Sequence, residues 1–105
     1  MTFEGKTYPL RPNFPDGTAI HGDVWTRPWT VVYYDDRRFE AILETSRFPD
    51  FNFPFPLIFR VCFSLRENRL SSKLTIENRH LRRVPVGMGF HPFWNRRVET
   101  SGSDV

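Results

Sequence analysis

The run from Gly87 to Asn95, GMGFHPFWN, places a histidine among aromatic side chains near the end of the chain. Histidine can give or take a proton at neutral pH, because its unperturbed pKa is about 6.5. Phe93 and Trp94 offer flat apolar faces beside His91. The run therefore suits proton transfer to a ligand with both polar and apolar sides, although a histidine packed in a core has the same neighbours.

A second run, from Asn13 to Gly22, reads NFPDGTAIHG and carries His21, with Trp25 shortly after it. Glycines in both runs let the backbone turn sharply or approach a ligand closely. Two histidines in such settings are the candidates for acid and base chemistry in this chain.

The order of these motifs resembles the galactose mutarotase (aldose 1-epimerase) family. In that family a short hairpin with a glycine leads into an Asn-containing loop, an AIHG segment and a Trp that opens a strand. A later hairpin ends in Asn, and a P-x-G turn and an HP pair with an aromatic follow. The matching residues here are Phe3-Glu4-Gly5, Asn13 to Gly22, Trp29, Asn78, Pro85-Val86-Gly87 and His91-Pro92-Phe93.

The resemblance implies an isomerase that interconverts the anomers of a hexose by acid and base ring opening. By this resemblance His91 is the general acid, and His21 is the second histidine, which binds a sugar hydroxyl on the ring-oxygen side. The two imidazoles are expected to face one concave surface and to share a ligand. The residues expected to contact the sugar are Trp25, Phe93, Trp94 and Asn95.

The chain also departs from the family pattern. The family's catalytic base is a glutamate near the C-terminus, supported by an aspartate from the same region and an arginine upstream of the first hairpin. None of the acids of this chain matches the base. Residues 1–105 are therefore expected to be a partial domain that lacks the N-terminal and C-terminal portions, and the isolated chain is expected to be inactive.

Two alternatives remain open for the same pocket. One is a carbohydrate-binding β-sandwich without turnover, which the lack of a usable carboxylate favours. The other is an epimerase of hexose 6-phosphates, with Arg82-Arg83 or Arg96-Arg97 at the phosphate, because the arginine fork suits phosphate.

Composition limits the other function classes. The net charge of +3 comes with thirteen arginines in scattered pairs, so no nucleic-acid partner is expected. There is no apolar stretch of about 20 residues and no signal peptide, so no membrane contact is expected.

The single Cys62 fits a reducing compartment and a cytoplasmic location. Histidines at 21, 80 and 91 lack the spacing of a zinc motif, and we expect no metal and no cofactor.

The alternation of apolar and polar residues predicts an all-β fold, an antiparallel β-sandwich within one domain. Hairpins are expected over Pro56 to Asn78 and over Trp29 to Thr45, with Phe39, Ala41 and Leu43 lining one face of the second. The three prolines between Arg47 and Pro56 predict a covering loop. Shorter strands are expected over Leu81 to Val86 and Gly89 to Trp94.

Three further expectations concern packing. Trp29 leads an apolar strand and is expected in the core instead of the sugar site. The loop phenylalanines Phe51, Phe53 and Phe55 are candidates for exposure, and bare strand edges should let the chain self-associate.

Overall fold

The computed structural model describes residues 1–95, so the Arg96-Arg97 pair lies outside the described residues. Six strands and two short 3-10 helices make up the regular structure of this part. No helix within residues 1–95 is long and apolar enough to cross a membrane. The elements are β1 (Thr2–Phe3), β2 (Lys6–Thr7), η1 (Val24–Thr26), β3 (Thr30–Tyr34), β4 (Arg38–Glu44), η2 (Thr45–Arg47), β5 (Leu57–Arg66) and β6 (Arg69–Asn78).

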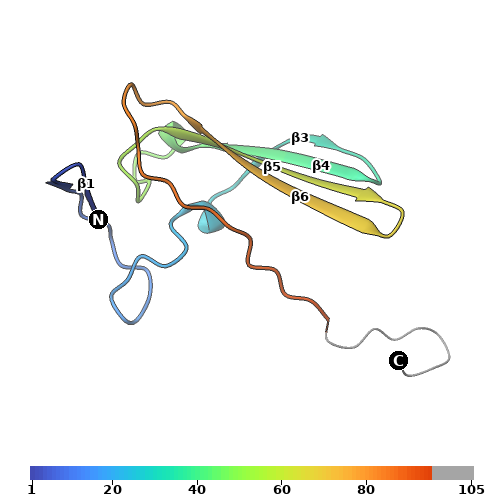
Figure 1. Ribbon diagram of the computed structural model, residues 1–105, viewed down its shortest axis with the longest axis horizontal. Coiled ribbons are helices and arrows are strands. Elements are labelled where there is room, and N and C mark those ends of the chain that lie inside the picture. The colour runs from blue at the N-terminus through green and yellow to red at the C-terminus, as the bar shows by residue number, and fades with distance from the viewer. Residues whose placement is uncertain (96–105) are drawn as a thin grey trace.

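The strands form two antiparallel sheets, a twisted four-stranded sheet in the order β3-β4-β5-β6 and a small hairpin of β1 and β2 (Figure 1). The prediction of an all-β antiparallel fold is confirmed. Both predicted hairpins are present, since β3 pairs with β4 and β5 pairs with β6 along ten residues. Each strand follows its neighbour in the chain, which is the simplest order for hairpin-linked strands.

Tight turns join the strands. The first hairpin turns at Glu4 and Gly5, both in left-handed backbone with φ of 47° and 74°. This is the conformation that a two-residue hairpin turn requires and that glycine adopts without strain. Between β3 and β4, the Asp35 carboxylate accepts hydrogen bonds from the backbone N–H groups of Arg37 and Arg38, at 2.8 and 2.7 Å. An aspartate at the start of a turn commonly closes it in this way.

One face of the four-stranded sheet holds the core, and we call it the apolar face. The register pairs Leu43 with Phe59 and Ala41 with Val61, so these side chains lie on the same side of the sheet. The buried cluster consists of Leu43, Leu57 and Phe59. Trp29 packs against it, with its ring centroid 6.4 Å from that of Phe59, which confirms its predicted place in the core.

The end of β4 is tied to the start of β5 by one buried hydroxyl. Thr45 is 3% exposed, and its Oγ1 accepts a hydrogen bond of 2.9 Å from the Leu57 N–H. This bond spans the Pro-rich segment between the two strands. It fixes the position from which the segment returns to the sheet.

The predicted strands over Leu81 to Val86 and Gly89 to Trp94 are wrong. The chain bends at Leu81 and Arg82 and makes no strand pairing from there to Trp94. After β6 the Asn78 side chain donates to the Arg82 carbonyl and accepts from the His80 N–H, so the chain turns out of the direction of β6. Pro85 also lacks the N–H that a ladder would need.

The predicted exposure of the loop phenylalanines is wrong as well. Phe55 is only 6% exposed, and Phe51 and Phe53 are half-buried against the core cluster. The ring of Phe55 lies 6.3 Å from Phe3 and 5.0 Å from Tyr8 of the first hairpin segment. The segment consists of turns and bends, and these direct the aromatic side chains inward.

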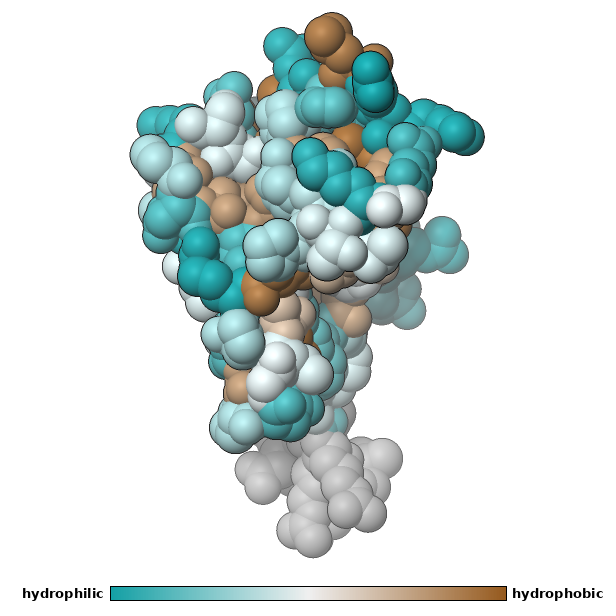
Figure 2. All heavy atoms as spheres, turned by 90° about the vertical axis from the view of Figure 1, so that its left-hand side faces the viewer, coloured by the Kyte–Doolittle hydropathy of each residue, from teal (hydrophilic) through white to brown (hydrophobic). Residues whose placement is uncertain are grey.

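The core is small for the length of the chain. The radius of gyration of the structure is 17.7 Å, whereas a compact domain of this size has a radius of gyration of about 13 Å. Large apolar side chains stay exposed on β3 and at the hairpin ends, among them Val31 (49%), Tyr34 (78%) and Leu70 (50%). Figure 2 shows hydrophobic groups among hydrophilic ones on the side of the molecule that faces left in Figure 1. The strands β3 and β6 are the edges of the sheet.

We expect Thr45→Val to lower the free energy of unfolding by about 1–3 kcal/mol, because it leaves the buried Leu57 N–H without an acceptor. Thr45→Ser keeps the hydroxyl and serves as the matched control. The measurement is urea unfolding followed by tryptophan fluorescence. An undiminished stability in Thr45→Val beside a loss in Thr45→Ser would mean that the methyl group, not the hydrogen bond, carries the stability.

We expect the chain to self-associate through its exposed edge and apolar side chains. Light scattering should then give a mass above the 12.5 kDa of one chain, rising with concentration. Val31→Lys places a charge on the edge strand and should shift the protein toward monomer. Leu81→Lys changes a fully exposed residue outside the sheet and should not. A wild-type mass of 12.5 kDa at every concentration would contradict the expectation.

Candidate functional site

The two candidate histidines come together from distant parts of the chain. His21 lies in the loop between β2 and η1, and His91 lies in the segment after β6. Their ring centroids are 5.5 Å apart, with the ring planes inclined at 65°. The predicted proximity of the two imidazoles is therefore confirmed. A small ligand that meets one imidazole is within reach of the other.

The segment that carries His91 is held by aromatic contacts. Phe90 packs on Phe63 of β5 with ring centroids 5.8 Å apart, and Phe63 lies on the apolar face. His91 and Phe93 have their centroids 4.9 Å apart. Phe90, itself 45% exposed, thus holds the segment to the sheet on one side, while His91 and Phe93 lie on the more open side.

The loop that carries His21 is fastened at both ends to the turn at Asp50–Asn52. At its start, Arg11 exchanges two hydrogen bonds of 2.8 Å with the Asn52 side-chain amide and also donates to the Asp50 carbonyl. At its end, the Asp23 carboxylate accepts from the Asn52 N–H at 3.0 Å. The loop is therefore fixed to the segment that covers the core.

Arg27 completes this attachment. Its guanidinium contacts Asp23 at 2.7 Å and Asp50 at 3.0 Å, and it lies over the rings of Phe48 and Phe51 at 5.3 and 5.8 Å from their centroids. Hydrogen bonds from Arg27 lower the pKa of Asp50 from its ordinary value. Burial raises the pKa of Asp23, but the Asn52 N–H and Arg27 outweigh it, so that this pKa is lowered as well.

The inside of the loop is ordered by Asn13, a residue for which the motif alone predicts no role of its own. Its side-chain oxygen accepts from the Ile20 N–H at 2.7 Å. Its amide nitrogen donates to the carbonyls of Ile20 and Gly22, both at 3.1 Å. These bonds bracket His21, whose backbone is left-handed with a φ of 59°. An Asn ahead of a Pro-Asp-Gly turn is the sequence signal for such side-chain to backbone bonding.

The predicted sugar-contacting aromatics are exposed. Trp25 is 61%, Phe93 88% and Trp94 73% exposed. Trp25 is tied to the histidine loop, because its indole N–H donates to the Gly22 carbonyl at 3.2 Å. Trp94 and Asn95 follow Phe93 on the exposed segment. The structure thus joins His21, His91, Phe93 and the Trp25 loop, and it leaves Trp94 and Asn95 in solvent.

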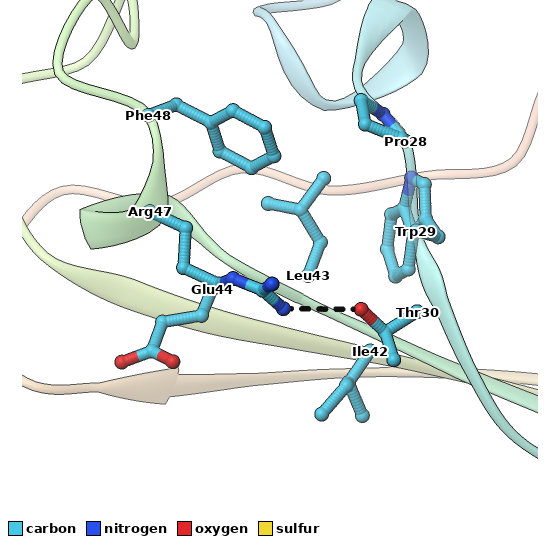
Figure 3. Close-up of a pocket in the computed structure, with 8 residues that line it drawn as sticks. All are labelled: Pro28, Trp29, Thr30, Ile42, Leu43, Glu44, Arg47 and Phe48. Atoms are coloured by element: carbon cyan, nitrogen blue, oxygen red, sulfur yellow. Dashed lines mark hydrogen bonds between the residues drawn. The ribbon is translucent and has the colours of Figure 1, made fainter.

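A pocket of about 240 Å³ lies elsewhere, beside the joint of β4 and η2 (Figure 3). Its walls include Trp29 and Phe48, and Arg47 donates to the Thr30 hydroxyl at 3.2 Å across it. None of the residues predicted for the sugar site lines this pocket. The histidine pair sits instead on an open surface, and we place the candidate site there because it carries the chemistry.

Among residues 1–95, no group of three or more His, Cys, Asp and Glu side chains is arranged to hold a metal ion. The ion pairs of this part of the chain all involve arginine, and none joins a carboxylate to His21 or His91. The chemistry of the pair is therefore that of two imidazoles, each able to donate or accept one hydrogen bond at either ring nitrogen.

The antiparallel all-β fold agrees with the comparison with known families. The profile of the aldose 1-epimerase family matches residues 1–104. The chain belongs to the aldose 1-epimerase family, whose fold is a β-sandwich.

One similar protein is the uncharacterized protein YphB of Escherichia coli strain K12. It is 27% identical over 101 residues, which cover 95% of this chain and 33% of YphB. The chain thus spans about a third of the length of this curated relative. No solved structure matches the chain significantly.

The free energy of unfolding at acid pH tests how much the ion pairs of Arg27 stabilise the fold. Both Asp23 and Asp50 have a pKa below the ordinary 3.8 in the folded state. Their contribution to stability is then complete above pH 3.8 and is lost as the pH falls through the lowered values. We expect Arg27→Met to lose less free energy of unfolding at acid pH than wild type, because it lacks the guanidinium that lowers both pKa values. The methionine keeps an apolar side chain over Phe48.

The control is Arg79→Met, which breaks the exposed pair of Arg79 with Glu77. It should leave the pH dependence unchanged, because exposed ion pairs contribute little. Urea unfolding between pH 7 and pH 3 is the measurement. If wild type and Arg27→Met lose the same free energy of unfolding as the pH falls, the contacts of Arg27 contribute no pH-dependent stability.

Proposed function

We propose that this chain provides two histidines of a hexose anomerisation site, with His91 as general acid and His21 as the hydroxyl-binding partner. The observation that carries the proposal is the 5.5 Å separation of the two imidazoles in a member of the aldose 1-epimerase family. The two residues are seventy positions apart in sequence, and nothing local to either run brings them together. A ligand bound by both imidazoles accounts for their proximity.

Interconversion of anomers needs two proton transfers around one sugar. One group removes the proton of the anomeric hydroxyl while another protonates the ring oxygen, and after rotation about the C1–C2 bond the ring closes with the roles reversed. Each well-placed group contributes about 10²–10⁴-fold to the rate. An imidazolium at His91 suits the donor at the ring oxygen, and His21 beside it suits a hydrogen bond to a neighbouring hydroxyl.

The exposed aromatics fit the apolar side of the sugar. Phe93 lies next to His91, and Trp25 is bonded to the backbone of Gly22 beside His21. Flat rings on either side of the histidine pair would receive the C–H faces of a hexose. We assign Trp94 and Asn95 to the same site as outer contacts, because they continue the segment of Phe93.

The base is the missing function at this site. No carboxylate within residues 1–95 pairs with either histidine, and no acid of the sequence matches the base of the family. We therefore infer that water takes the anomeric proton when this chain acts alone. A site without its base loses most of the proton-transfer contribution. We therefore propose that the 105-residue chain binds hexoses with millimolar affinity, about −4 kcal/mol, and does not catalyse mutarotation appreciably.

The same observation favours the second candidate, a carbohydrate-binding β-sandwich without turnover. A hexose 6-phosphate substrate has weaker support, since Arg83 is paired with Glu4 at 3.4 Å. We also propose a cytoplasmic location, because Cys62 is a free thiol and free thiols are typical of reducing compartments.

The test is an NMR titration of the chain with galactose and glucose, together with an anomerisation assay from the α-anomers. We expect His21→Ala and His91→Ala each to weaken sugar binding about tenfold or more, equal to at least about 1.4 kcal/mol. His80→Ala removes a histidine outside the pair and should bind like wild type.

We expect the anomerisation rate to stay at the uncatalysed value in all four proteins. A rate well above background that disappears in His91→Ala would contradict the missing base and give that role to a carboxylate of this chain. Equal sugar binding by wild type and both histidine variants would overturn the proposed site.

A further inference from the structure

The backbone at His21 has a conformation that it would not adopt unaided. His21 and Gly22 are both left-handed, with φ of 59° and 67°. Gly22 reaches this region without a steric penalty, whereas the Cβ of His21 comes close to the backbone carbonyl and makes the conformation unfavourable. A non-glycine residue stays there only where the surrounding structure holds it.

Asn13 supplies the holding contacts. Its amide accepts from the Ile20 N–H and donates to the carbonyls of Ile20 and Gly22, so one side chain meets three backbone groups on both sides of His21. Its backbone N–H also donates to the Thr18 carbonyl at 2.9 Å. An amide is the side chain that offers both a donor pair and an acceptor in this space, and a carboxylate would face two carbonyl oxygens.

The other hydrogen bonds of the loop do not hold the backbone on both sides of His21. The Asp16 carboxylate orders the preceding turn through the Thr18 N–H and hydroxyl, at 2.9 and 2.7 Å. Arg11 and Asp23 fasten the two ends of the loop to Asn52. The bond from Trp25 to the Gly22 carbonyl supports one side of His21 only.

We propose that Asn13 is the positioning residue of the histidine pair: its side-chain amide fixes residues 20–22 in the left-handed turn that directs His21 at His91. The role of this pair toward sugar rests on the function proposed above. The geometric part of the proposal stands on the protein alone, and the experiment measures the two parts separately.

The geometric part is tested with histidine-labelled protein by NMR. In wild type, His91→Ala should shift the ring resonances of His21, because the neighbouring imidazole lies 5.5 Å away. In the Asn13→Ala background the same removal of His91 should shift them by less than half as much. Asn13→Asp keeps the size of the side chain but loses both donors, and it should behave like Asn13→Ala.

The matched control is Asp35→Ala. Asp35 likewise bonds two backbone groups, the N–H groups of Arg37 and Arg38, but it closes the turn between β3 and β4, outside both histidine segments. In its background the full effect of His91→Ala on His21 should remain. The amide spectrum of β3 to β6 should be unchanged in the Asn13 variants, because every bond of the Asn13 side chain stays within residues 13–22.

Full coupling of the two rings in Asn13→Ala, or in Asn13→Asp, would overturn the proposal. For the sugar part, galactose binding to Asn13→Ala should weaken as much as binding to His21→Ala. If wild type binds no hexose while the rings still uncouple in Asn13→Ala, the proposed function fails and the positioning role stands. If wild type binds hexose and Asn13→Ala binds equally well with coupled rings, the positioning role fails and the function stands.

Discussion

The constraint on which this structure depends is the need to cover one apolar face of a four-stranded sheet. The strands themselves supply only Leu43, Leu57 and Phe59 as a buried cluster, and the remaining cover comes from segments without regular structure. The Pro-rich stretch after β4, the residues around Trp29 and the chain after β6 all pack on that face. Burial of apolar area is the main favourable free energy of folding, so these segments are held by it.

The histidine pair follows from this covering. Phe90 reaches the sheet at Phe63 and brings His91 with it, while Arg11 and Asp23 fasten the loop of His21 to the turn at Asn52. The loop of His21 is therefore attached to the cover of the core, whereas the segment of His91 is attached to strand β5 through Phe90. These two parts of the chain meet at His21 and His91, whose ring centroids are 5.5 Å apart. Loops positioned by a sheet are the usual carriers of binding and catalytic residues.

Most of the sheet could be predicted from sequence because β4, β5 and β6 alternate apolar and polar residues in a local and regular way, while β3 is rich in β-branched and aromatic residues. Leu57, Phe59 and the residues two positions apart identify the buried side of β5 without any knowledge of the partner strands. The proximity of His21 and His91 could be predicted only from the order of motifs that the family shares. No property of either run shows that they meet.

The remaining features depend on tertiary contacts. Phe55 is buried because Phe3 and Tyr8 come to it from the first hairpin, a contact that its neighbours in sequence do not indicate. The stretch from Leu81 to Trp94 has the composition of strands, but the turn at Asn78 takes it out of the direction of β6 and it pairs with no strand. The ion pair of Arg27 with Asp50 likewise joins positions 23 residues apart.

A crystal structure of the chain with a bound hexose tests the histidine site most directly. We predict sugar oxygens within hydrogen-bonding distance of both His21 and His91, with a ring face against Phe93 or Trp25. A hexose seated instead in the pocket beside Trp29 and Arg47, with both histidines free of it, would contradict the central claim.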